Sequence, residues 1–175
     1  MASSNSLTEE WRSRPPFSWL PQSVREPQEP LRAILTGYLL TFVGSILLSA
    51  TVQGILALVG SSAPREVPDF GSGWMMLFGV VVFAPVVETL IMASVLSALL
   101  TLVSPSVAIV VSAVGWGIAH SLLVPTWGLV IWWPFLIFST LFVVWRERGW
   151  GAALAVPAGA HALHNLVPAL TLQLW

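Results

Sequence analysis

Four polar side chains stand in apolar stretches of this 175-residue chain, and together they have the types needed to hydrolyse an amide bond. They are Glu88, His120, His161 and Asn165. A carboxylate and an imidazole can take a proton from water, which makes the water a nucleophile. A second imidazole and an amide can donate hydrogen bonds to the oxyanion that forms when water attacks a carbonyl. We therefore treat the four residues as one candidate site.

The spacing of these residues is helical. His161 and Asn165 are four residues apart, so on a helix they share one face, a single turn from each other. Trp116 and His120 have the same spacing, which gives this histidine an aromatic neighbour. His164 follows His161 by three residues and is a weaker candidate for the same face. Taken singly, a histidine or asparagine in an apolar helix often only hydrogen-bonds a neighbouring helix, a contribution of about 1 kcal/mol.

Charged residues are few and are kept apart from the apolar runs. Hydrophobic residues make up 56% of the chain, charged residues make up 9%, and the mean hydropathy is +0.84. A soluble domain carries about a quarter charged residues, so this composition indicates a membrane protein. Between residues 70 and 145 the single charge is Glu88. An ionisable group at membrane depth is costly and normally faces the bundle interior, and its natural partners here are the histidines.

The composition also excludes several classes of protein. The net charge is −1 and no basic cluster offers itself to phosphate, so we expect no nucleic-acid partner. The chain has no cysteine, which rules out disulfides and thiolate chemistry. Residues 1–30 lack the apolar run of a signal peptide.

The apolar runs predict an all-α, polytopic membrane bundle of about five transmembrane helices. Each expected span has roughly the 20 residues needed to cross a bilayer, and the spans are residues 34–59, 74–103, 106–123, 127–145 and 150–172. Pro85 lies inside the second span, where we expect a kink or tilt, and we expect Pro134 to interrupt the fourth. Tryptophans near the span ends are expected to anchor the helices at the interface: Trp74, Trp127, Trp145, Trp150 and Trp175.

Residues 1–32 are rich in Pro, Ser, Glu and Arg, and we expect them to form a flexible or surface-lying cytoplasmic tail. Phe17, Trp19 and Leu20 are its expected anchors, and residues 33–175 form the transmembrane domain. The positive-inside rule gives the orientation. With a cytoplasmic N-terminus and five spans, six of the seven arginines lie inside and Arg65 lies outside, together with the C-terminus.

Three short motifs follow one another on the expected spans. They are Pro85-x-x-Glu88, Trp116-x-x-x-His120 and His161-x-x-x-Asn165. In this order they resemble the CPBP family, which comprises the CAAX proteases and bacteriocin-processing enzymes and is also called the Abi family. The resemblance covers residues 74–168 and implies an intramembrane protease.

The first motif departs from the pattern Glu-Glu-x-x-x-Arg that is usual in the family. Thr89 stands in place of the second glutamate, and Ala93 stands in place of the arginine. If those two residues normally pair, losing both together is self-consistent, because no unpaired charge remains. The aromatic residue of the second motif is Trp116, where phenylalanine is common.

The resemblance implies a role for each candidate residue. Glu88 and His120 would position and deprotonate water, and His161 and Asn165 would donate to the oxyanion. A zinc-dependent version is the alternative, with Glu88, His120 and His161 holding the metal and water in the fourth position. A glutamate that binds metal is poorly placed to act as the base, and Thr89 replaces the obvious second carboxylate. We therefore favour a site without metal or other cofactor.

A function of a different class also stays open. Abi-type proteins can act as immunity or partner proteins, and a Glu/His pair in a bundle can relay protons. The expected partners are membrane lipid and a membrane-associated peptide or protein substrate. A short, all-helical chain of this kind is typical of bacterial members, so the expected location is the bacterial plasma membrane.

Overall fold

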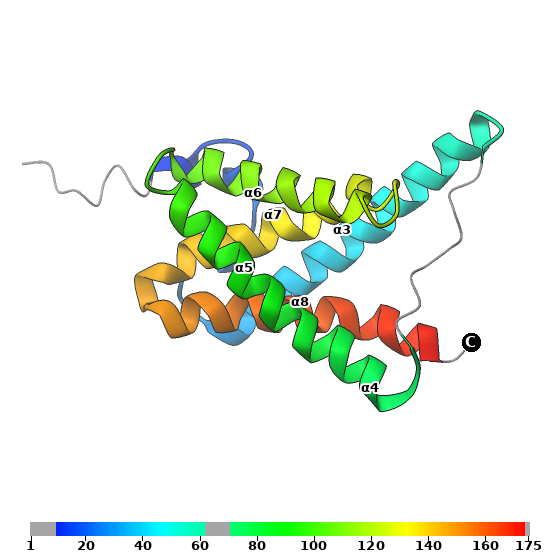
Figure 1. The fold of residues 1–175 in the computed structure, drawn as a ribbon. Helices are drawn as coiled ribbons and strands as arrows, with labels where there is room; N and C mark the ends of the chain where they lie inside the picture. Colours follow the sequence, from blue (N-terminus) through cyan, green and yellow to red (C-terminus); the bar gives the residue numbers. More distant parts are fainter. Residues whose placement is uncertain (1–9, 62–70, 174–175) are drawn as a thin grey trace, which may run out of the picture.

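The computed structural model describes residues 10–61 and 71–173, and within these residues all regular structure is helical (Figure 1). Five long helical stretches make up the bundle: α3 (Pro30–Leu58), the continuous run of α4 (Gly73–Phe78), η3 (Gly79–Phe83) and α5 (Ala84–Leu99), α6 (Pro105–Ser121), α7 (Gly128–Trp145) and α8 (Trp150–Gln173). Four short elements complete the described part: η1 (Glu10–Ser13), η2 (Phe17–Trp19), α2 (Gln22–Arg25) and η4 (Arg146–Arg148).

This architecture confirms the predicted polytopic helical bundle. The five stretches lie within a few residues of the expected spans, and they run through the bundle in alternating directions (Figure 1). Three of them are long and apolar enough to qualify as membrane spans: residues 30–58, 73–99 and 128–148. α6 is apolar but shorter, and the polar side chains of α8 lower its hydropathy. The five-span topology therefore stays a prediction.

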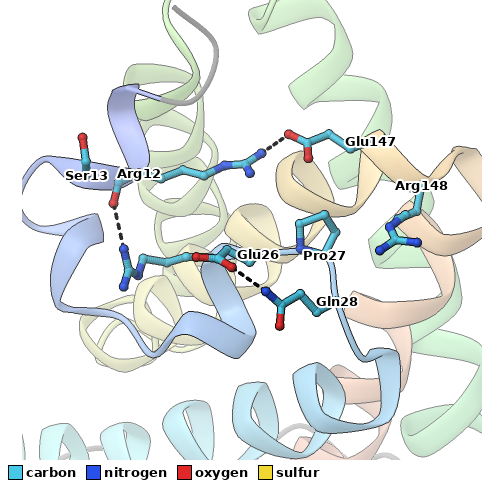
Figure 2. Close-up of a pocket in the computed structure, with 8 residues that line it drawn as sticks. Arg12, Ser13, Glu26, Pro27, Gln28, Glu147 and Arg148 are labelled. Carbon is cyan, nitrogen blue, oxygen red and sulfur yellow. Dashed lines mark hydrogen bonds and ion pairs between the residues drawn. The ribbon is translucent and has the colours of Figure 1, made fainter. Parts of the chain in front are cut away.

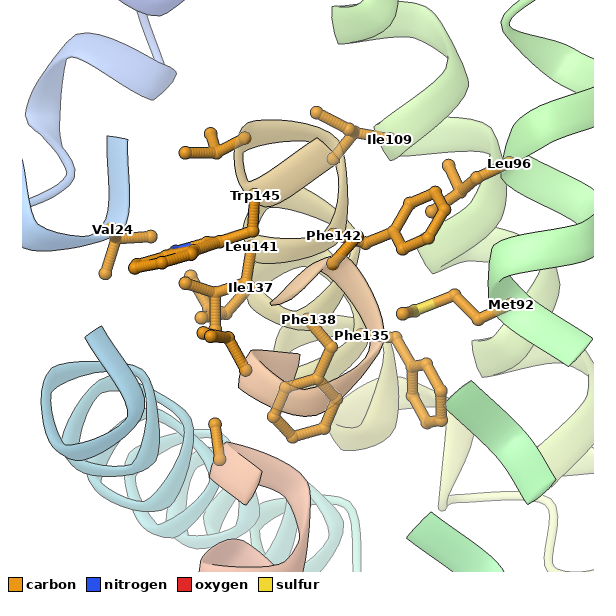
Figure 3. Packing of buried hydrophobic residues seen from close by; sticks show 14 of the residues in the cluster. Val24, Met92, Leu96, Ile109, Phe135, Ile137, Phe138, Leu141, Phe142 and Trp145 are labelled. Carbon is orange, nitrogen blue, oxygen red and sulfur yellow. The ribbon is translucent and has the colours of Figure 1, made fainter. Parts of the chain in front are cut away.

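Helix α7 is the centre of the bundle. It contacts α2, α3, α5, α6 and α8. More than half of the residues in its most apolar 18-residue stretch are buried. In α3, by contrast, only 6% of the most apolar 18-residue stretch is buried, so most of its apolar side chains are available to lipid. Figure 3 shows the large side chains of α7 pointing in several directions, toward the neighbouring helices; Phe135, Ile137, Phe138, Leu141, Phe142 and Trp145 are all buried.

Some prolines stand in first helical turns, where a missing backbone N–H costs least, whereas Pro134 lies inside α7 and Pro157 and Pro168 lie inside α8. The α7 helix continues through Pro134, so the interruption expected there is not found. Pro30 and Pro105 stand in the first turns of α3 and α6, as helix-initiating prolines do. Pro85 lies just after η3, which is a π-helical turn inserted between α4 and α5. The irregularity predicted at Pro85 therefore takes the form of a π turn. Gly149, with φ of 94°, makes the turn from η4 into α8 that a residue with a side chain would resist.

The described part of the tail is packed against the bundle. Of the two expectations for this segment, a flexible tail or a surface-lying one, the second fits these residues. Trp11, Phe17 and Val24 are buried within the core, and Figure 3 shows Val24 beside Trp145. Phe17 thus anchors the tail to the bundle, whereas Trp19 is 77% exposed and does not join this core. Trp145 was also wrongly expected at the interface, since it is 3% exposed and belongs to the core.

The tail and the turn between α7 and α8 meet at one end of the bundle. The Arg12 guanidinium pairs with the Glu147 carboxylate, and a polar pocket of about 620 Å³ lies beside this pair (Figure 2). Arg25 and Arg148 also line this pocket. Arginines far apart in the sequence therefore lie at the same end of the bundle, in keeping with the orientation that the positive-inside rule predicts. Arg65 and Trp175 lie outside the described residues.

Candidate active site

The Glu88 carboxyl faces the His161 imidazole between α5 and α8. Glu88 Oε2 lies 3.8 Å from His161 Nε2. This Oε2 atom is buried and has no hydrogen-bond partner among the residues that the structure describes. The Glu88 side chain keeps 24% of its surface exposed, whereas that of His161 keeps 6%. The predicted meeting of these two residues across the bundle is therefore found, and one carboxyl oxygen is left to bind something else.

Aromatic side chains of α7 hold His161 in place. Its ring stacks on Phe138, with centroids 4.6 Å apart and planes inclined by 23°. Phe135 meets the same imidazole edge-on, with centroids 5.5 Å apart. Because Phe135 and Phe138 are three residues apart on one helical face, both can contact a single ring on α8. The imidazole thus has little freedom to turn away from Glu88.

His120 lies in the last turn of α6 and contacts the same Phe135. The two ring centroids are 5.7 Å apart. His120 Nδ1–H donates to the Trp116 carbonyl at 2.9 Å. A carbonyl oxygen can only accept, so the proton is on Nδ1 and Nε2 of the neutral ring is left as an acceptor. The predicted neighbour Trp116 is present, with its ring centroid 5.8 Å from that of His120 and the two planes tilted. Trp116 stacks flat on Phe135.

The end of α6 that carries His120 is fixed against α7 by small residues. Gly117 lies so close to Gly128 that a Cβ atom on either one would meet the other's carbonyl oxygen. Ser121 completes the junction, because its hydroxyl donates to the Pro125 carbonyl at 3.2 Å and accepts from the Gly128 N–H at 3.1 Å. The Pro125 carbonyl and the Gly128 N–H, at the turn between α6 and α7, therefore find hydrogen-bond partners within the protein.

Asn165 lies one turn beyond His161 on α8, as its spacing predicted. Its side-chain Nδ2 donates to the Val80 carbonyl of η3 at 2.9 Å. The asparagine therefore contacts the same helical run that carries Glu88. Its partner, Val80, precedes Glu88 by eight residues. This backbone partner was not foreseen from the sequence.

His164, the weaker candidate, points to α3 instead of toward Glu88. The Thr41 hydroxyl donates to the Tyr38 carbonyl at 2.9 Å, so its oxygen accepts from His164 Nδ1–H at 3.1 Å. Thr41 is fully buried, and Phe42 lies beside the His164 ring. This histidine joins two helices, which is the ordinary structural role of a polar residue in a membrane bundle.

The predicted alternative ligand set for zinc does not assemble. Among the described residues, no three His, Cys, Asp or Glu side chains lie close enough together to hold a metal ion. His161 faces Glu88, while His120 is turned toward Trp116 through its Nδ1. As arranged, these three side chains do not form a group that could hold zinc, which takes ligands about 2 Å away. The choice between a metal-free and a zinc-dependent mechanism stays a prediction.

Other residues near the site were not identified from the sequence. Phe135 and Phe138 support the imidazoles, but an aromatic pair three residues apart is equally typical of an ordinary core helix. Thr89 and Ala93, the two departures from the family pattern, are 2% and 4% exposed on α5. A lone carboxylate or guanidinium at either position would be buried, so their joint replacement by neutral residues suits the packing.

The fold and the site together define a polytopic membrane protein with an intramembrane carboxyl–imidazole pair. The sequence pattern of the type II CAAX prenyl endopeptidase Rce1-like family matches residues 70–167, which include all four candidate residues. The chain belongs to this family of endopeptidases, and the resemblance to the CAAX proteases is confirmed. No curated protein and no solved structure matches the chain.

Proposed function

We propose that the chain hydrolyses a peptide bond of a membrane-associated substrate, with Glu88 as the general base. The observation that carries this proposal is the carboxyl oxygen Oε2, which is buried without a hydrogen-bond partner in the described part of the chain and lies 3.8 Å from His161 Nε2. Burying a polar group without a partner costs free energy. A reactant that binds this oxygen during turnover would satisfy it.

The distance between the two side chains suits a shared water molecule. A separation of 3.8 Å is too long for a direct hydrogen bond between Glu88 and His161, but one water can bond both atoms at about 2.8 Å. Glu88 would take a proton from this water as its oxygen attacks the substrate carbonyl. The same proton would then pass to the leaving amine, so that the carboxylate is regenerated.

We assign a further contact with this water, beside those of Glu88 and His161, to His120. Its Nδ1–H is engaged by the Trp116 carbonyl, so the lone pair on Nε2 is available to accept a hydrogen bond. Phe135 touches both His120 and His161, so both imidazoles border the same aromatic side chain. Among described residues, however, the imidazole facing Glu88 is that of His161. Substrate binding would have to bring His120 closer to the reacting water.

His161 and the free amide N–H of Asn165 are proposed as donors to the oxyanion. Both lie on one face of α8, and Asn165 Nδ2 carries two hydrogens, of which the bond to Val80 uses one. Removing an oxyanion donor typically lowers kcat by roughly 10²–10³-fold. The protease domain proposed is residues 33–175, which holds the whole family match.

The experiment begins by finding the substrate. Membranes from a host strain that lacks the gene should accumulate an uncleaved membrane protein, and wild-type protein should restore its cleavage. The Glu88→Gln variant should not restore it, whereas Ser94→Ala should, because Ser94 is an exposed residue of the same helix that bonds only its own turn. Full cleavage by Glu88→Gln would overturn the proposed function and favour a non-enzymatic partner protein.

A further inference from the structure

The π turn before Glu88 leaves one main-chain carbonyl without its backbone donor. In η3 the Ala84 N–H donates to the Gly79 carbonyl, five residues earlier. In the same register the next carbonyl, that of Val80, would accept from the N–H of residue 85. Residue 85 is proline and has no N–H. A carbonyl at membrane depth without a partner costs several kcal/mol, so Val80 needs a donor from elsewhere.

Asn165 supplies that donor from another helix. Its Nδ2 reaches the Val80 carbonyl at 2.9 Å, which is an ordinary hydrogen-bond length. The bond joins α8 to η3, eight residues before Glu88, and starts from the turn of α8 that follows His161. Eight residues of helix span about 12 Å. The two helical runs are thus joined at two levels, once by Asn165 and Val80 and once by Glu88 and His161.

We infer that Asn165 is a positioning residue for the Glu88 carboxyl, acting through the carbonyl that Pro85 leaves open. The hydrogen bond fixes how far the π turn lies from α8 and how the following helix is rotated. That rotation decides whether Glu88 points at His161 or toward lipid, because a one-residue change of register turns a side chain by about 100°. This role rests on the proposed function and is additional to a donor role in the oxyanion hole.

The test is a double-mutant cycle between residues 165 and 85. Asn165→Leu keeps a similar volume but cannot donate. Pro85→Ala restores a main-chain N–H that can bond Val80 in the existing register. In the Pro85 parent, the leucine variant loses both the positioning bond and the oxyanion donor. In the Pro85→Ala background it loses only the oxyanion donor. The loss of kcat should therefore be at least fivefold smaller in that background, with KM little changed.

A second readout follows the Glu88 carboxyl directly and needs no substrate. The infrared band of this group is identified as the one that Glu88→Gln removes. We expect the band to shift in Asn165→Leu and to return to the parent position in the double variant. An unshifted band, or equal losses of kcat in both backgrounds, would overturn the positioning role. An active Glu88→Gln variant would instead overturn the proposed function, and the infrared prediction would still stand.

Discussion

Glu88 of α5 and His161 of α8 face each other across 3.8 Å, although neither helix carries a countercharge for the carboxyl. One carboxyl oxygen has no hydrogen-bond partner within the described residues, and the imidazole is held by stacking on Phe138. An ion pair built for stability would close to direct contact and satisfy both partners. An open, partly satisfied pair is the arrangement expected where a water or substrate oxygen enters.

The two histidines of α8 should differ sharply in function. His161→Ala should lower kcat by roughly 10²–10³-fold, as the loss of an oxyanion donor does. His164→Ala should instead cost about 1 kcal/mol of stability, because it removes the hydrogen bond to Thr41, and should leave kcat within a fewfold of wild type. Peptide hydrolysis and thermal unfolding in detergent measure the two effects.

The control for this comparison is Thr41→Val. Its loss of stability should not add to that of His164→Ala, because the two residues share one bond. A loss of kcat in His164→Ala as large as that in His161→Ala would contradict the division of roles.

The topology prediction is tested by reporter fusions. The described tail and η4 lie at one end of the bundle, joined by Arg12 and Glu147. We propose that this end is cytoplasmic, since it gathers the arginines. Reporters fused after Gly149 and after Trp175 should therefore report opposite sides of the membrane. The same side for both would refute five spans and leave α8 as a helix that does not cross.

Chelation separates the two mechanisms. A strong chelator should leave hydrolysis almost unchanged if Glu88 and a histidine activate water without metal. A zinc enzyme would be silenced and then restored by added Zn²⁺. Stoichiometric zinc in the purified protein, lost together with activity, would replace the metal-free mechanism while keeping the protease.

The sequence was sufficient to predict what depends on composition and short spacing. The five helices follow from apolar runs, and the shared face of His161 and Asn165 follows from the helical period. The partner of Asn165 could not be predicted in this way. It depends on a π turn, and the local sequence before Pro85 does not distinguish a π turn from a kink.

Long-range packing limited the prediction of the N-terminal tail and the aromatic support. Val24 is buried because α2 packs against α7, and Trp11 is buried against Phe17, contacts that local polarity conceals. Phe135 supports two imidazoles for a similar reason. In an apolar helix, where nearly every residue is hydrophobic, the sequence does not show which face meets the protein and which meets lipid.

The most direct measurement of the proposed chemistry is the hydrolysis rate of the Glu88→Gln variant in lipid vesicles, with the accumulating membrane protein as substrate. Glutamine keeps the shape of the side chain but cannot accept a proton from water. We expect no detectable cleavage, with a thermal unfolding temperature close to that of wild type and of the Ser94→Ala control. Cleavage at the wild-type rate by a folded Glu88→Gln protein would contradict the assignment of Glu88 as the base.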